Sequence, residues 1–420
     1  MAVLALAGGA PLSKKGYSIK WPVVTEADVR AVARVAGSGA WWRFAGREVE
    51  KFEKEFGRYH DARHVLCVAN GTVAIEVALR ALGICPGDEV IVPSVTFIAS
   101  ASAVLIARAV PVFADVLEAT CQIDPADIER KITQRTRAVV VVHYAGYPAD
   151  MDAILKIADK HGLKVIEDCA HAQGSAWRGR KVGCLGDFGT FSFQQSKSLT
   201  CGEGGAVVTD SRELYERAYA YHHIGRALGS ERYEHTTVGP NYRLTEFQGA
   251  ILRTQLRKLQ KQTEKRMRNA AILSRELEGL PGLEPIARDG RITQRGYYFY
   301  VLRFDEDRFG ISRDRFLEAM AAEGAPLGVG YKVPVYQLPA FSQMSFDRTG
   351  CPVSCGYYQG LMDYSQVHCP VAEQVSLKRH ITLPNDVLLQ EQNVRLVAAA
   401  ARKIWKNRAE LARITHRESK

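Results

Sequence analysis

The sequence lacks the glycine signatures of the common nucleotide-binding folds. No G-x-G-x-x-G follows the first strand-like run at residues 64–68, and no P-loop motif G-x-x-x-x-G-K-[ST] occurs anywhere. Because these glycines let the backbone approach a dinucleotide or a triphosphate, their absence argues against Rossmann-type dehydrogenases and P-loop NTPases.

Long hydrophobic runs are also missing. The longest apolar stretch, residues 97–107, is shorter than the roughly 20 residues that a membrane-spanning helix needs. The apolar residues 3–7 are not preceded by the basic residues of a secretory signal. We therefore expect a cytoplasmic protein with no membrane partner.

The nine cysteines form no paired framework of the kind that staples small secreted domains. Most lie among apolar or glycine-rich neighbours, as reduced structural thiols do. Cys351, Cys355 and Cys369, with His368 beside the last, are the one group worth testing as metal ligands. Their C-x-x-x-C spacing matches no compact zinc signature, so we expect no metal site and leave the role of the three thiols open.

The net charge of +10 is unevenly distributed. Residues 251–268 carry seven basic residues and one acid, and residues 402–420 carry seven basic and two acidic residues. Both stretches have helical apolar stripes, so solvated basic helix faces are a simpler explanation than a nucleic-acid site. A non-catalytic regulatory protein that binds nucleic acid through these helices remains a remote alternative, and it would require strongly salt-dependent binding.

Short β-branched runs alternate with helical patterns through the first 250 residues. The expected strands are residues 64–68, 89–92, 110–113, 137–143, 164–167, 189–193 and 206–209. This alternation predicts an α/β protein with a mostly parallel sheet covered by helices on both faces.

A long basic helix at 244–280, a strand at 297–304 and a helix at 313–323 follow. We predict an N-terminal arm (1–20), a large domain (21–250), and a linking helix with a small C-terminal α/β domain (251–420).

Ligands of open parallel sheets bind at the carboxyl ends of the strands, so the residues just after each strand are the candidates for a binding site. Asn70, Gly71 and Thr72 open a helix and suit either a phosphate site or a plain helix cap. Phe97 follows the second strand as a stacking ring or a core residue. Asp168 ends the fifth strand, where a buried acid needs a cationic partner unless it caps a helix.

Lys197 lies between an apolar strand and the glycine-rich turn 201–206. Desolvation there would lower the pKa of its amine and make it a competent Schiff-base nucleophile, although most turn lysines are simply solvated. Pyridoxal 5′-phosphate (PLP) requires such a lysine, a carboxylate for its pyridinium nitrogen, a phosphate cradle and a stacking ring. The sequence offers a residue for each requirement: Lys197 as the lysine, Asp168 as the carboxylate, Gly71 and Thr72 with Ser192 as the phosphate cradle, and Phe97 as the stacking ring.

Four segments also resemble the DegT/DnrJ/EryC1/StrS family of PLP-dependent sugar aminotransferases. They are GDEVIVPSVTFIASASAV (87–104), ADMDAILKIADKHGLKVIEDCAHAQGSAWRGRKVG (149–183), GDFGTFSFQQSKSLTCGEGGAVVTD (186–210) and GPNYRLTEFQGAI (239–251). The resemblance extends from about Trp21 to the C-terminus. It implies the aspartate-aminotransferase (type I PLP) fold and a homodimer with shared active sites.

The same resemblance implies roles for individual residues. Lys197 would be the catalytic lysine, Asp168 the pyridinium partner, Phe97 the stacking ring and His171 a neighbour of the cofactor. Ser192 and Gln195 would lie near the cofactor phosphate or hydroxyl. Asn241 would reach the phosphate from the neighbouring subunit, with Arg243 nearby.

Within the family, residues 38–64, 294–310 and 334–341 are most similar to L-glutamine:scyllo-inosose aminotransferases. The Trp-Trp-Arg element also resembles 3-amino-5-hydroxybenzoate synthases. We expect amino transfer from L-glutamine or L-glutamate to a ring ketone, with Arg243, His223 and Tyr336 on the substrate side. Residues 221–226 and 294–296 differ from the family pattern near the expected substrate entrance.

Three alternatives accompany this expectation. The acceptor could be a nucleotide-linked ketosugar, or the enzyme could be a PLP-dependent dehydratase or aromatising synthase of the 3-amino-5-hydroxybenzoate type. Family dehydratases carry histidine in place of the lysine, so Lys197 disfavours dehydration. The third alternative is the non-catalytic regulatory protein that binds nucleic acid through its basic helices.

Overall fold

Seven strands form the central sheet in the order β1-β9-β8-β5-β4-β2-β3. The computed structural model describes residues 3–411 except 19, 232, 347, 359 and 361. The strands are β1 (His64–Val68), β2 (Glu89–Pro93), β3 (Val110–Ala114), β4 (Thr136–Val142), β5 (Lys164–Asp168), β8 (Phe188–Ser192) and β9 (Gly205–Thr209). Of these, β9 alone runs antiparallel to its neighbours. The predicted mostly parallel α/β sheet is confirmed.

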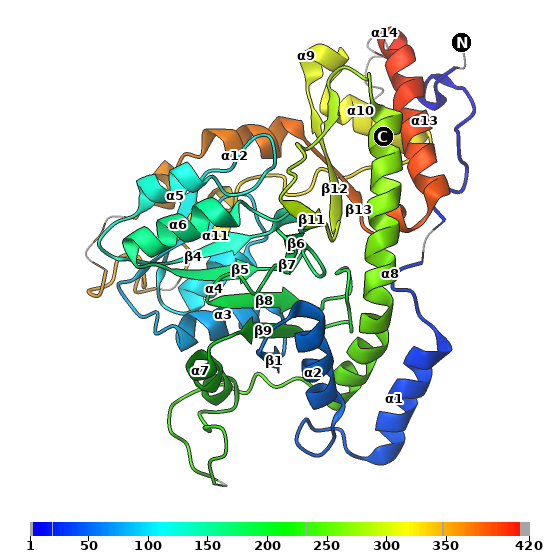
Figure 1. Cartoon of the computed structure of the whole chain (residues 1–420). Coiled ribbons are helices and arrows are strands. Elements are labelled where there is room, and N and C mark those ends of the chain that lie inside the picture. The colour runs from blue at the N-terminus through cyan, green and yellow to red at the C-terminus, as the bar shows by residue number, and fades with distance from the viewer. Residues whose placement is uncertain are drawn as a thin grey trace.

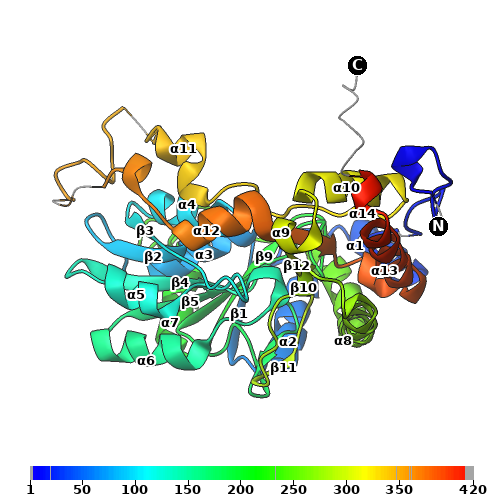
Figure 2. The same ribbon diagram turned by 90° about the horizontal axis from the view of Figure 1, so that it is seen from above.

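Helices cover both faces of this sheet. They are α2 (Glu48–His60), α3 (Gly71–Ala81), α4 (Ala99–Ile106), α5 (Pro125–Lys131), α6 (Met151–His161) and α7 (Arg212–His222). Seen from above, α3 and α4 lie on one face and α5 and α6 on the other (Figure 2).

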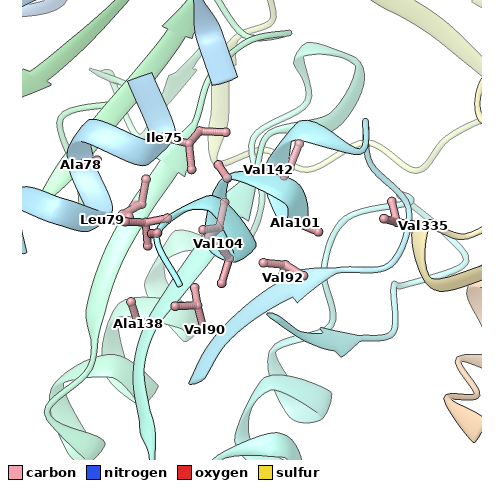
Figure 3. Packing of buried hydrophobic residues seen from close by; sticks show 14 of the residues in the cluster. Ile75, Ala78, Leu79, Val90, Val92, Ala101, Val104, Ala138, Val142 and Val335 are labelled. Carbon is pink, nitrogen blue, oxygen red and sulfur yellow. The ribbon is translucent and has the colours of Figure 1, made fainter. Parts of the chain in front are cut away.

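Two apolar clusters fill the space between the sheet and its helices. Val90 and Val140 pack with α3 and α4, whereas Ile91, Val139 and Val141 pack with α2, α5 and α6. Figure 3 shows side chains of α3, α4, β2 and β4 converging in the first cluster. Because successive strand side chains point to opposite faces, a strand buried on both faces is apolar at every position.

A single helix, α8 (Glu246–Leu277), joins this sheet to the C-terminal α/β domain (Figure 1). That domain contains a three-stranded sheet of β10 (Leu283–Pro285), β12 (Phe299–Phe304) and β13 (His380–Pro384). Helices α10 (Arg313–Ala322) and α13 (Glu391–Lys406) pack with it around a third apolar cluster. The N-terminal segment joins this domain, since Leu4 is buried in the cluster and the Ala5 amide donates to Glu323.

The remaining elements are short or peripheral. A small sheet combines β6 (Ala176–Trp177), β7 (Arg180–Lys181) and β11 (Ile292–Gln294), and α1 (Glu26–Ser38) packs along α8. Short helices are α9 (Glu306–Phe309), α11 (Pro339–Ser342), α12 (Pro370–Gln374) and α14 (Arg408–Leu411). Within the described residues, no helix is both long and apolar enough to span a bilayer.

The basic residues of α8 do not all face solvent, which corrects the sequence interpretation. Arg253 pairs with Glu48 and Glu55 of α2, and Lys258 pairs with Asp28 of α1 at 2.6 Å. Arg266 is fully buried and donates to Asn385. These side chains therefore attach α8 to its neighbours. Of the second basic stretch, residues 412–420 lie outside the described residues.

Candidate active site

Lys197 lies in the loop between β8 and β9, at the carboxyl end of β8. Backbone hydrogen bonds from Gln195 to Gly202 and from Lys197 to Gln194 hold this loop. The Lys197 amine lies 4.4 Å from the centre of the Tyr298 ring. Burial lowers the pKa of Lys197 to about 8, while the charge of Asp168 opposes that shift. At that pKa about a tenth of the amine is neutral and nucleophilic at pH 7, far more than for an exposed lysine.

Asp168 ends β5 and is buried close to Lys197. Its Oδ2 accepts a hydrogen bond of 2.9 Å from the Ser100 hydroxyl, and its Oδ1 accepts one of 3.1 Å from the Ala170 amide. Burial raises the pKa of Asp168, against the hydrogen bonds from Ala170 and Ser100 and the charge of Lys197. A carboxylate has about four acceptor positions, so it retains room for a further donor. A protonated pyridine nitrogen is a donor of that kind.

The neighbouring Glu167 has a structural role. His143 accepts from the Ala149 amide through Nδ1, so its Nε2 carries the proton that it donates to Glu167 at 2.9 Å. The Glu167 carboxylate also accepts backbone N–H groups of Gly183, Leu185 and Gly186. Because these donors occupy Glu167, it fixes the end of β5 and thereby the position of Asp168.

The start of α3 and the end of β8 meet at Gly71 and Ser192. A Cβ atom at Gly71 would lie 2.7 Å from the Ser192 Cβ, so only glycine permits this contact. Asn70 caps the helix by accepting from the Val73 amide at 2.9 Å. The first N–H groups of a helix have no intrahelical acceptor and favour anions. Gly71, Thr72 and Ser192 thus form a cradle of phosphate-binding character.

Phe97 and His171 place aromatic rings at the same edge of the sheet. Phe97 follows β2, and its side chain is 55% exposed, which is unusual for a phenylalanine and leaves its ring open to a planar ligand. His171 is buried, stacks on Tyr298 at 4.0 Å and accepts from the Ala145 amide. Burial and the charge of Lys197 lower the pKa of His171 well below its usual value, so the imidazole is neutral.

His223, which is buried, forms a separate cluster with the exposed Asn241 and the partly buried Arg243. His223 and Asn241 make an isolated bridge, and Arg243 donates to His223 Nδ1 at 3.0 Å. Burial and the charges of nearby arginines, Arg243 first, lower the pKa of His223 to about 4. No hydrogen bond or ring contact among the described residues joins this cluster to Lys197 or Asp168. Arg243 also bridges Val68 at the end of β1, which keeps the cluster beside the Gly71 cradle.

A comparison with protein families decides the identity of this site. Residues 22–402 match the model of the DegT/DnrJ/EryC1/StrS aminotransferase family. The chain belongs to this family. Its members depend on PLP, so the protein is a PLP-dependent transaminase. The predictions of family, cofactor and enzyme class are confirmed.

Individual relatives match over most of the chain. A 3-amino-5-hydroxybenzoate synthase of Amycolatopsis mediterranei is 40% identical over 329 residues, covering 77% of this chain and 84% of that protein. An L-glutamine:2-deoxy-scyllo-inosose aminotransferase of Streptoalloteichus tenebrarius is 37% identical over 430 residues, covering 97% and 99%. The crystal structure of a 3-amino-5-hydroxybenzoic acid synthase has a TM-score of 0.82 at 34% identity and covers 93% of this chain and 100% of that one. The expected type I fold is confirmed.

The residues of this transaminase fit PLP. Lys197 is desolvated, Asp168 is buried with acceptor capacity to spare, and the Gly71–Ser192 contact leaves a helix N-terminus open. Gln195 lies in the Lys197 loop with its side chain exposed, and its carbonyl accepts from the Trp21 indole. Its predicted place near the cofactor phosphate or hydroxyl stays a prediction, as do the phosphate contact of Asn241 and the substrate-side roles of Arg243 and His223.

Tyr336 is the predicted site residue that the structure places elsewhere. Its side chain is 1% exposed and packs against Phe113. Its hydroxyl donates to Glu373 at 2.6 Å and accepts from the Cys369 amide at 3.0 Å. The hydroxyl therefore uses both its donor and its acceptor capacity inside the core, so the position of Tyr336 does not support the expected substrate contact.

The structure adds Ser100 and Tyr298 to the site, neither of which the sequence analysis singled out. Ser100 lies in the first turn of α4, and its hydroxyl is 2.9 Å from both Asp168 and Thr96. Tyr298 contacts Lys197 and His171 from β11–β12, and its hydroxyl is 2.9 Å from that of Ser196. The hydroxyl residues that follow Phe97 were a usable signal, but the contact of Tyr298 depends on the fold.

Replacing Ser100 with alanine is expected to destabilise the ionised form of Asp168, because the carboxylate loses a hydrogen bond. A hydrogen bond to a charged group contributes about 1.5–3 kcal/mol, so kcat/KM should fall by roughly tenfold or more. Because the pKa of Asp168 should rise further, the acid limb of the pH–rate profile should move to higher pH. Ser102→Ala, on the same helix, is the control. An unchanged acid limb in Ser100→Ala would contradict this role.

Replacing Gly71 with alanine is expected to weaken cofactor binding. The new Cβ would push against Ser192 at 2.7 Å, and the dissociation constant of PLP from the apoprotein should rise by about tenfold or more, as loss of one good phosphate contact would produce. Equilibrium titration of PLP measures the change. Gly37→Ala is the matched control, since a Cβ there meets nothing within 4 Å. Equal PLP affinities for the two variants would rule out the cradle.

Proposed function

We propose that this transaminase moves the amino group of L-glutamine, or of L-glutamate, to a ring ketone of a cyclitol such as scyllo-inosose. The observation that carries the proposal is the near full-length similarity, over 97% of the chain, to an aminotransferase named for L-glutamine and 2-deoxy-scyllo-inosose. The desolvated Lys197 beside Asp168 supplies the groups that amino transfer needs.

Each residue then has a definite task. When bound, PLP takes up the amino group and the electrons released at the donor Cα. Asp168 keeps the proton on the pyridine nitrogen, and Gly71, Thr72 and Ser192 hold the phosphate. The Lys197 amine removes the proton from the donor Cα and later returns a proton to the acceptor carbon. A pKa of about 8 suits an amine that must do both near neutral pH.

The proposal is tested first by spectroscopy. Adding L-glutamine to the PLP-loaded enzyme should replace the visible band of lysine-linked cofactor with the shorter-wavelength band of its aminated form. The aminated enzyme, freed of donor, should then return to the first spectrum when a ring ketone is added. A cofactor band that ignores both L-glutamine and L-glutamate would overturn the donor assignment.

A panel of acceptors separates the alternatives. scyllo-Inosose and 2-deoxy-scyllo-inosose should restore the original spectrum, while nucleotide-linked ketosugars should not. The 40% identical relative named 3-amino-5-hydroxybenzoate synthase makes an aromatising synthase the second candidate. Formation of an aromatic absorbance from a non-aromatic ring ketone would favour that candidate over a cyclitol aminotransferase.

The proposed functional unit is a homodimer with shared sites in the cytoplasm. An apolar groove of about 530 Å³ lies between α1, α8 and the Lys197 loop, lined by Val24, Val29, Val32 and Ile251. Asn241 is exposed, and the nearby Arg243 lies over the ring of the half-exposed Trp42. A second copy would bury both surfaces. None of the nine cysteines, all of which lie in the described part of the chain, takes part in a disulfide bond.

Mixing two inactive variants tests the shared site. If Asn241 serves the partner's cofactor, Lys197→Ala and Asn241→Ala chains should restore one intact site in each mixed dimer. After random exchange of subunits, activity should reach about a quarter of the wild-type value. Absence of any recovery, with mixed dimers demonstrated by mass spectrometry, would contradict the shared site.

A further inference from the structure

Cys351 and Cys355 lie together in a loop far from Lys197. Their sulfur atoms are 2.7 Å apart, with the Cys351 thiol donating to Cys355. Both side chains are partly exposed. Cys369, the third member of the sequence cluster, is buried and lies beside Tyr336 instead. Among the described residues, no third histidine, cysteine or acidic side chain groups with this pair as a possible metal ligand, and two thiols alone do not make a zinc site.

The loop itself holds the two thiols in contact. The Val353 and Ser354 amides both donate to the Gly350 carbonyl, and the Tyr358 amide donates to the Cys355 carbonyl. The Val353 side chain is buried, which fixes the middle of the loop against the protein. Tyr358 anchors its far end, because its hydroxyl donates to Glu89 at 2.9 Å at the start of β2. The sulfur contact is thus part of a hydrogen-bonded turn.

Cys355 also differs chemically from the other cysteines. The hydrogen bond from Cys351 and the backbone N–H groups of Tyr357 and Tyr358 lower the pKa of Cys355, against a small burial effect. Burial raises the pKa of the remaining thiols whose shifts are known: Cys67, Cys85, Cys121, Cys169, Cys184, Cys201 and Cys369. Thiolate character and access together mark a cysteine as reactive toward oxidants.

We propose that Cys355 and Cys351 form a redox-modification site that reacts with hydroperoxides and closes to a disulfide. The Cys355 thiolate attacks a peroxide oxygen, the O–O bond breaks, and the leaving hydroxide takes a proton to become water. The resulting sulfenic acid is then attacked by the Cys351 sulfur, the S–O bond breaks, and a second water leaves. The two thiols lose two electrons, and hydrogen peroxide is reduced to two waters.

The experiment uses the PLP-loaded full-length enzyme treated with hydrogen peroxide. Remaining thiols are alkylated, and digestion with trypsin and chymotrypsin separates Cys369 from the pair. The peptide with Cys351 and Cys355 should lose two hydrogens, escape alkylation and be restored by dithiothreitol. Cys355 should be oxidised at least a few-fold faster than Cys85, the exposed thiol with a raised pKa, because the thiolate is the form that reacts.

Two variants separate the steps. Cys351→Ser should stop at the sulfenic acid, which dimedone traps on Cys355, whereas Cys355→Ser should leave Cys351 reduced. Both should retain wild-type transamination before oxidation, because neither residue contacts the site. Full alkylation of both cysteines after peroxide treatment, or oxidation of Cys85 at the same rate, would overturn the proposal.

Discussion

Replacing Lys197 with alanine is expected to reduce kcat by at least about 10⁴-fold, because the variant loses both the amine that moves the substrate proton and the covalent link to the cofactor. PLP should still bind through Asp168 and the Gly71 cradle, and its absorbance should be that of the unlinked aldehyde. Steady-state turnover with L-glutamine, together with the spectrum of the loaded variant, measures both effects.

Lys181→Ala provides a matched control for that experiment. Burial also lowers the pKa of Lys181, and its amine lies 4.9 Å from the Tyr59 ring, much as Lys197 lies over Tyr298. Lys181 instead donates to the Gly174 carbonyl in the small β6–β7 sheet. Turnover within a few-fold of wild type is expected for Lys181→Ala. Similar losses in both variants would show that a desolvated lysine at either place is merely structural.

Replacing Asp168 with alanine is expected to lower kcat by about 10³-fold, the usual effect of removing a preorganised charge from the reacting group. Without the carboxylate, the pyridine nitrogen should lose its proton at neutral pH and accept electrons poorly. A PLP analogue methylated at that nitrogen carries a permanent positive charge. This analogue should raise the activity of Asp168→Ala at least about tenfold relative to PLP, and it should leave the activity of Lys197→Ala unchanged.

The same substitution should not destabilise the fold. Because burial raises the pKa of Asp168 in the folded protein, the folded state binds a proton more tightly than the unfolded state. The ionised carboxylate therefore opposes folding, increasingly so as the pH rises through the range between the two pKa values. The free energy of unfolding of the apoprotein at neutral pH should be unchanged or higher in Asp168→Ala. Marked destabilisation with no rescue by the methylated cofactor would mean a structural role.

Much of the fold could be predicted because the local pattern and the final environment agree. All seven strands of the central sheet begin and end within about one or two residues of the apolar runs in the sequence. A strand buried on both faces, such as β4, has few alternatives to a continuous apolar run. Lys197 and Asp168 could be singled out as candidates for a related reason, since polar residues at the carboxyl ends of such strands are conspicuous.

The errors concern contacts between segments distant in sequence. Arg253 and Lys258 look like solvated charges until α1 and α2 bring acids to them. Tyr336 lies in a segment that resembles the family, yet resemblance does not reveal that Glu373 and Cys369 satisfy its hydroxyl. Ser100 approaches Asp168 across 68 positions of the chain. A local sequence pattern does not reveal which residues so far apart in the chain lie in contact.

The long helix α8 has a consequence for how the two main sheets are held together. Its 32 residues, at about 1.5 Å each, make a rod of roughly 48 Å. Its first half is attached to α1 and α2, and its second half is attached through Arg266 and Asn269 to the chain around Asn385. The central sheet and the C-terminal sheet are therefore tied to opposite halves of one continuous helix.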